Sequence, residues 1–275
     1  FVGLLWLPLD TALQSAGRET PAGAFQALLK FARWGALGFG VAVAGLWAEN
    51  LVRFPPAGLG DLFASTYRIA LPLQVVIGAA MIVLLSRLLA GPTAERSSVG
   101  LPWEFSVLTV LGFGAILLEV AASHTASEPT WWPLGPIADA VHLYGAALWV
   151  GGLLAILRAR PWLRQPTPAA FSRDLLAAFS RFAFLGTVLL LSAGIVLALI
   201  LVGSVDGLVG TGYGWIVLAK SSLLVPMVAL GAWNRRTLRH QGDVEAPDVR
   251  TVERLSRNVR LEAILGAVVL VLAGL

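Results

Sequence analysis

Two histidines are the residues of this chain best suited to metal chemistry. His124 and His142 lie close together in the sequence, with Asp139 between them and Glu119 just before them. Imidazole nitrogens, assisted by carboxylate oxygens, bind transition metals such as copper and zinc. The chain has no cysteine and only two methionines, which excludes disulfides and thiolate metal sites. We therefore predict a metal site formed by His124, His142, Asp139 and Glu119.

The sequence around His142 predicts a helix with one functional face. Asp139, His142, Gly145 and Trp149 follow one another at spacings of three and four residues, so they share a face of an α-helix. Gly145 on this face would permit close approach of another helix. Asp139 would then orient the imidazole ring of His142 as a metal ligand. The alternative is a buried histidine that only forms a hydrogen bond to a neighbour.

A second group of polar and soft side chains falls inside predicted helices. Lys220 either pairs with Glu119 or acts as a fixed charge on an ion path, because ionisable groups inside a membrane are costly. The methionines either fill the core or act as soft ligands for Cu(I). We interpret Glu104 and Glu262 as residues at helix starts that favour the helix dipole. The candidate transport path comprises Lys220, Gln74, Met81, Met227 and Trp149.

The composition of the 275-residue chain predicts an integral membrane protein. Hydrophobic residues make up 57% of the chain and charged residues only 13%, against about 25% charged in soluble domains. This excludes an ordinary soluble enzyme and a disordered chain, and the net charge of +4 gives no support to nucleic-acid binding. We predict an all-α, polytopic transmembrane bundle embedded in the lipid bilayer. Its eight helices are expected at residues 1–13, 31–50, 65–89, 103–122, 137–157, 179–202, 213–233 and 259–275.

The distribution of basic residues predicts the orientation of this bundle. Of the 20 Lys and Arg residues, 17 flank or lie in the connections between helices one and two, three and four, five and six, and seven and eight. Positive charge accumulates on the cytoplasmic side of membrane proteins. We therefore place these four connections in the cytoplasm and the other three outside.

An internal repeat relates the two halves of the chain. Tyr67, Gln74 and Met81 recur as Tyr213, Lys220 and Met227, each pair separated by 146 residues. An even number of spans separates the equivalents, so the repeat is parallel, with its axis along the membrane normal. We expect two four-helix units, residues 1–122 and 123–275. In this arrangement the first and last helices of the chain are truncated.

Four segments resemble the CopD (copper resistance protein D) family. Residues 138–153 are similar to its signature helix, and residues 122–126 to the segment that precedes it. Residues 212–236, with Tyr213, Lys220 and Asn234, resemble a Tyr-Gly, Lys, Asn-Arg-Arg helix, and residues 259–263 resemble the start of the last helix. The resemblance covers roughly residues 100–275, while the first part of the chain matches mainly in layout.

This resemblance implies copper binding and import from the periplasmic side across the bacterial inner membrane. It also implies a periplasmic, CopC-like copper carrier as a partner, and His124 and His142 as the matched histidines. No phosphate-binding loop, nucleophile elbow or paired catalytic carboxylates occur in the sequence, so we do not expect an enzyme.

Two other functions fit the same residues. The chain could be a non-catalytic accessory subunit with a CopD-like fold in a larger respiratory or photosynthetic membrane complex. It could also bind a b-type haem, which needs two facing histidines inside the bundle. His124, in the connection between the fourth and fifth predicted helices, is too peripheral for that role.

Overall fold

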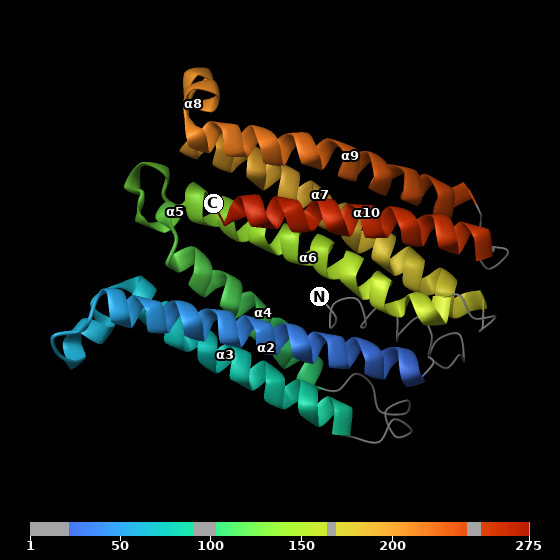
Figure 1. Cartoon of the computed structure of the whole chain (residues 1–275), viewed down its shortest axis with the longest axis horizontal. Helices are drawn as coiled ribbons and strands as arrows, with labels where there is room; N and C mark the ends of the chain where they lie inside the picture. Colours follow the sequence, from blue (N-terminus) through green and yellow to red (C-terminus); the bar gives the residue numbers. More distant parts are fainter. Residues whose placement is uncertain (1–21, 91–102, 164–168, 241–248, 275) are drawn as a thin grey trace. The chain divides into compact units, whose positions relative to one another are not determined.

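The computed structural model describes residues 22–90, 103–163, 169–240 and 249–274 (Figure 1). These residues form nine α-helices and two short 3-10 helices, and the described part of the chain contains no strand. The prediction of an all-α fold is therefore confirmed. The predicted helix at residues 1–13 lies outside the described residues.

Six of the described helices are long and apolar enough to cross a membrane. They correspond in order to the second to seventh predicted spans. A bilayer offers no hydrogen-bond partners to the backbone, so a chain that crosses it satisfies its N–H and C=O groups within helices. The six helices are α2 (Ala22–Arg53), α3 (Thr66–Ala90), α4 (Trp103–Ala121), α6 (Leu134–Leu163), α7 (Ala169–Leu201) and α9 (Gly212–His240).

The last predicted helix, at residues 259–275, lies within helix α10 (Val249–Ala273) apart from its end. This helix is not among the six candidates. Its first half carries several charged residues, including Arg254, Arg257 and Arg260, whereas its second half is apolar. The helix therefore begins with a charged segment at Val249 rather than at the predicted residue 259.

Helices α2, α6, α7 and α9 are longer than the hydropathy of the sequence predicts, whereas α3 and α4 keep nearly the predicted bounds. Pro161 is expected in a connection, but α6 continues through it to Leu163. A proline in the last turn sacrifices one backbone hydrogen bond and does not have to end the helix there. Pro72 and Pro226 lie within α3 and α9, as expected.

The chain forms two compact units. The N-terminal unit comprises residues 25–140, and the C-terminal unit comprises residues 141–275 together with the start of α2. In the N-terminal unit α3 packs along α4, and α2 and α3 approach closely where a Cβ atom on Gly78 would lie 3.2 Å from the Cα atom of Gly40. A 3-10 helix (Leu59–Phe63) lies between α2 and α3, and α5 (His124–Ser127) and a second 3-10 helix (Pro129–Trp131) lie between α4 and α6.

In the C-terminal unit α9 packs against both α7 and α10. A short helix, α8 (Val205–Gly210), projects from the start of α9 (Figure 1). Gly203 ends α7 with a positive φ of 71°, a conformation that glycine adopts without strain. The Ser204 side chain then caps α8 by accepting a hydrogen bond from the Gly207 N–H (3.0 Å).

The predicted orientation can be tested on the two ends of α3. The chain has no native cysteine, so single cysteines can be introduced without background. Ala57 and Ala90 are exposed and lie before and at the end of α3. We expect Ala57→Cys to react with a membrane-impermeant maleimide in intact cells, and Ala90→Cys to react only after permeabilisation. The reverse pattern would contradict the orientation.

Candidate metal centre

Helix α6 holds His142 against helix α7. The His142 Nδ1 atom lies 3.0 Å from the Leu190 carbonyl oxygen. The ring also packs beside Gly194, where an added Cβ atom would lie 3.2 Å from Cε1. The imidazole is therefore positioned by a backbone carbonyl of a neighbouring helix.

This hydrogen bond shows that Nδ1 of the His142 ring carries a hydrogen. A carbonyl oxygen only accepts, so Nδ1 carries the hydrogen and donates it. The neutral ring then has its lone pair on Nε2, which is the form in which histidine ligates metals. A metal-binding histidine commonly donates its other ring N–H to a carbonyl or carboxylate oxygen, and this hydrogen bond orients the ring.

Two glycines make this arrangement possible. A Cβ atom on Gly145 would lie 2.6 Å from the Leu190 nitrogen and 2.8 Å from the Gly186 oxygen. A Cβ atom on Gly186 would in turn lie 3.0 Å from the Gly145 oxygen. The two helix backbones are thus in direct contact one turn beyond His142. The prediction of close helix approach on this face is confirmed.

In the N-terminal unit, Asp139 belongs to a hydroxyl network. Asp139 Oδ2 accepts a hydrogen bond from the buried Thr125 hydroxyl at 3.0 Å. The Thr125 oxygen lies 2.7 Å from the Ser123 hydroxyl. This network fixes the start of α5, whose first residue, His124, is exposed. Asp139 therefore ties the segment that carries His124 to the start of α6.

A further carboxylate lies in the connection that follows His124. The hydroxyl and the backbone N–H of Thr130 hydrogen-bond to Glu128 and hold the pKa of this exposed carboxyl below its ordinary value. Glu128 is therefore ionised at neutral pH. It adds negative charge to the connection that we predict to face outward.

Glu119 and Gln74 form a second polar contact in the N-terminal unit. The Gln74 side-chain nitrogen donates to Glu119 Oε2 at 3.1 Å and to the Ala115 carbonyl at 3.3 Å. Gln74 is buried, and its Oε1 atom has no partner. Lys220, the predicted partner of Glu119, lies in the C-terminal unit, so that pair stays a prediction.

The described residues contain no group of three or more His, Asp and Glu side chains that could hold a metal ion. His124, Asp139 and Glu119 belong to the N-terminal unit and His142 to the C-terminal unit. Their joint ligation of one metal ion stays a prediction.

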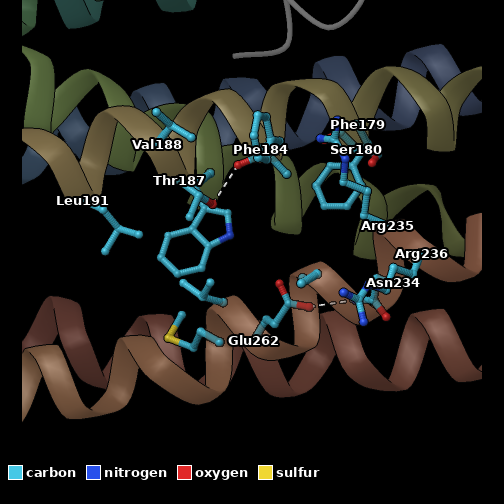
Figure 2. A pocket seen from close by; sticks show the side chains of 16 residues that line it. Phe179, Ser180, Phe184, Thr187, Val188, Leu191, Asn234, Arg235, Arg236 and Glu262 are labelled. Carbon is cyan, nitrogen blue, oxygen red and sulfur yellow. Dashed lines mark hydrogen bonds between the residues drawn. The ribbon is translucent and has the colours of Figure 1, made fainter. Parts of the chain in front are cut away.

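The C-terminal unit contains a cavity of about 390 Å³ between α6, α7, α9 and α10 (Figure 2). Two members of the predicted path line it: Trp149, which is 4% exposed, and Met227, which is fully buried. Trp149 lies seven residues after His142, hence about 10 Å further along α6 and on the same face. The other path residues, Gln74 and Met81, lie on α3 of the N-terminal unit, and Lys220 lies on α9.

Glu262 lines the same cavity, and our interpretation of this residue as a helix-start carboxylate is wrong. It lies in the middle of α10, is only 3% exposed, and accepts a hydrogen bond from the Asn234 side chain at 2.8 Å. Asn234 in turn accepts from the Asn258 side chain at 2.8 Å. The spacing of Asn258 and Glu262, four positions apart on α10, was the sequence signal that could have revealed this network. Glu104 does lie in the first turn of α4, as expected.

Comparisons with known proteins show which family the sequence resembles. Residues 173–275 match the CopD family, described as copper resistance protein D. Three similar proteins cover 64–72% of the chain. The copper transport protein CutJ of Bacillus subtilis is 30% identical over 202 residues, and the inner membrane protein YebZ of Escherichia coli is 30% identical over 182 residues. The copper resistance protein D of Pseudomonas syringae pv. tomato is 28% identical over 215 residues.

The matched regions make up 35% of CutJ, 58% of YebZ and 66% of copper resistance protein D. The chain thus spans about a third of the first relative and less than two thirds of the second. No solved structure gives a significant match.

The contact between α6 and α7 gives a testable prediction. We expect Gly145→Ala to lower the free energy of unfolding by about 1–3 kcal/mol, because the added methyl group overlaps backbone atoms that cannot move aside. The measurement is thermal unfolding of the detergent-solubilised protein. The matched control is Gly38→Ala, where no heavy atom lies within 4 Å of the added group. Equal unfolding temperatures for the two variants would contradict the prediction.

Proposed function

Because the chain belongs to the CopD family, we propose that it imports copper from the periplasmic side of the bacterial inner membrane into the cell. The names of two relatives, a copper transport protein and a copper resistance protein, support copper as the substrate. The name of a third, an inner membrane protein, supports the location. The six membrane-spanning candidates are consistent with a transport role.

The observation that carries the proposal is the hydrogen bond between the His142 ring and the Leu190 carbonyl. Its ring is held by the Leu190 carbonyl in the tautomer that leaves Nε2 as the ligating nitrogen. Imidazole nitrogen is a good ligand for copper in both common oxidation states.

We assign the outward-facing copper ligands to His142 and His124, assisted by Asp139 and Glu119. The carboxylates compensate the charge of the incoming cation. Each carboxylate accepts a hydrogen bond from a neutral side chain, Asp139 from Thr125 and Glu119 from Gln74.

The inward route follows α6 towards the cavity that Trp149 and Met227 line. Lys220, Gln74 and Met81 are assigned to the same route on the basis of the repeat. Matching contacts in the two units support the repeat: the Met81 methyl group lies next to Gly112 on α4, as the Met227 methyl group lies next to Gly266 on α10. A periplasmic, CopC-like carrier would deliver copper to the outer ligands.

Copper uptake into proteoliposomes that contain a trapped chelator tests this function. We expect the double variant His124→Ala, His142→Ala to reduce the initial uptake rate roughly 100-fold or more. Even the loss of a residue that only orients a metal ligand lowers metal affinity or activity about 10–100-fold. His240→Ala is the matched control, because it removes the third histidine of the chain from the predicted cytoplasmic side.

Uptake by the double variant at the wild-type rate would contradict the assignment of the histidines. Absence of uptake by the wild-type protein, combined with its co-purification with other membrane subunits, would favour the accessory-subunit alternative.

A further inference from the structure

The cavity of the C-terminal unit has a buried floor and an exposed mouth. Helix α6 contributes Trp149 and α10 contributes Glu262, which are only 4% and 3% exposed. The remaining lining comes from α7 and α9, and there Phe184, Val188 and Ala232 are exposed. Exposed apolar side chains on a membrane-spanning helix are suited to contact with lipid. The cavity therefore opens between α7 and α9, on a surface suited to the lipid bilayer.

The lining of the cavity is polar at one end and apolar at the other. Asn234, Arg235 and Arg236 gather at one end (Figure 2). Val188 and Leu191 lie towards the opposite end (Figure 2). The polar end belongs to the last part of α9, which leads into a basic connection that we predict to be cytoplasmic. The cavity thus has the polarity of one membrane leaflet, with its charged end towards the predicted cytoplasmic surface.

The Arg235 side chain is held against the α7 wall of the cavity. Its guanidinium carbon lies 4.2 Å from the centroid of the Phe184 ring, and Nη1 donates to the Ser180 carbonyl oxygen at 3.4 Å. A guanidinium group is a planar fork of N–H donors that matches the oxygens of a phosphate. The exposed Arg236 side chain adds a second such fork beside it.

The charges of the lining favour an anion over a cation. Arg235 and Arg236 carry two positive charges, and Glu262 carries one negative charge when it is ionised and none when it is protonated. The lining therefore keeps at least one excess positive charge in either state. A phosphodiester group has a single negative charge and complements this excess.

We infer that the cavity binds one anionic phospholipid of the cytoplasmic leaflet, with its phosphate on Arg235 and Arg236 and an acyl chain between α7 and α9. Basic pockets between transmembrane helices on the cytoplasmic side bind anionic lipid headgroups in this way. The volume of about 390 Å³ is that of a ligand pocket. The inference goes beyond the proposed function and does not rest on it, because neither copper nor the histidines enter it.

The internal repeat predicts that the lipid site occurs once in the chain. With the separation of 146 residues, the equivalents of Arg235 and Arg236 in the N-terminal unit are Leu89 and Ala90. These side chains carry no charge and cannot bind a phosphate group. We therefore expect one tightly bound lipid for each chain rather than two.

Native mass spectrometry of the full chain in detergent tests the headgroup. The probes are phosphatidylglycerol and phosphatidylcholine with the same acyl chains. We expect one phosphatidylglycerol to bind at least about tenfold more tightly than phosphatidylcholine. The double variant Arg235→Gln, Arg236→Gln should lose this preference. The matched control is Arg254→Gln, Arg257→Gln, which removes two exposed arginines of α10 that do not line the cavity and should keep the preference.

The acyl chain is tested separately from the headgroup. Val188→Trp places an indole ring in the apolar part of the cavity and leaves both arginines in place, so we expect phosphatidylglycerol affinity to fall at least about tenfold. Glycerol 3-phosphate, which has the phosphate but no chain, should not displace the bound lipid at equal concentration. The unfolding temperatures of the lipid-free variants show whether they are folded. If the double arginine variant does not fold, the single substitution of the exposed Arg236 by Gln tests the headgroup contact, and a partial loss of the preference is expected.

Several results would overturn the inference. Equal affinity for the two lipids, or the same loss in both double variants, would show that only the general surface charge acts. Full affinity in Val188→Trp would place the lipid outside the cavity. Displacement by glycerol 3-phosphate would indicate a site for a free phosphate ester, and a dimer that excludes lipid would assign the cavity to a second copy of the chain.

Discussion

The absence of water from the bilayer core is the constraint on which the rest of this structure depends. It makes helices the favoured form for the spanning backbone, and it makes a polar side chain without a partner inside the bundle unfavourable. The partners are specific: the Leu190 carbonyl for His142, Glu119 for Gln74, and Asn234 for Glu262. The few polar groups are consequently held in defined orientations, which is what ligand binding requires.

Glycine determines how closely these helices approach. Lipid tails compete with apolar side chains, so helices in a membrane associate through close van der Waals contact rather than through exclusion of water. Gly145 and Gly186 bring α6 and α7 to backbone contact, and this contact places the Leu190 carbonyl within reach of the His142 ring. The same type of contact recurs where Met81 and Met227 lie against glycines. The glycine contacts that allow close packing thus also determine the geometry of the candidate ligands.

One face of α6 connects His142 to the cavity of the C-terminal unit. His142 and Trp149 are two turns apart on α6, and Trp149 lines the cavity that contains Met227 and Glu262.

The sequence by itself determined the helical class, the order of the six spanning candidates and the face that His142 shares with Gly145 and Trp149. These properties depend on local composition and on a fixed period of 3.6 residues per turn. Helix ends were less predictable, because the hydropathy of α6 falls before its backbone stops at Leu163. Only the tertiary structure decided the partners: Leu190 for His142, and Asn234 for a glutamate that the sequence placed at a helix start. Partners depend on the rotation and register of separate helices, which spacing within one helix does not encode.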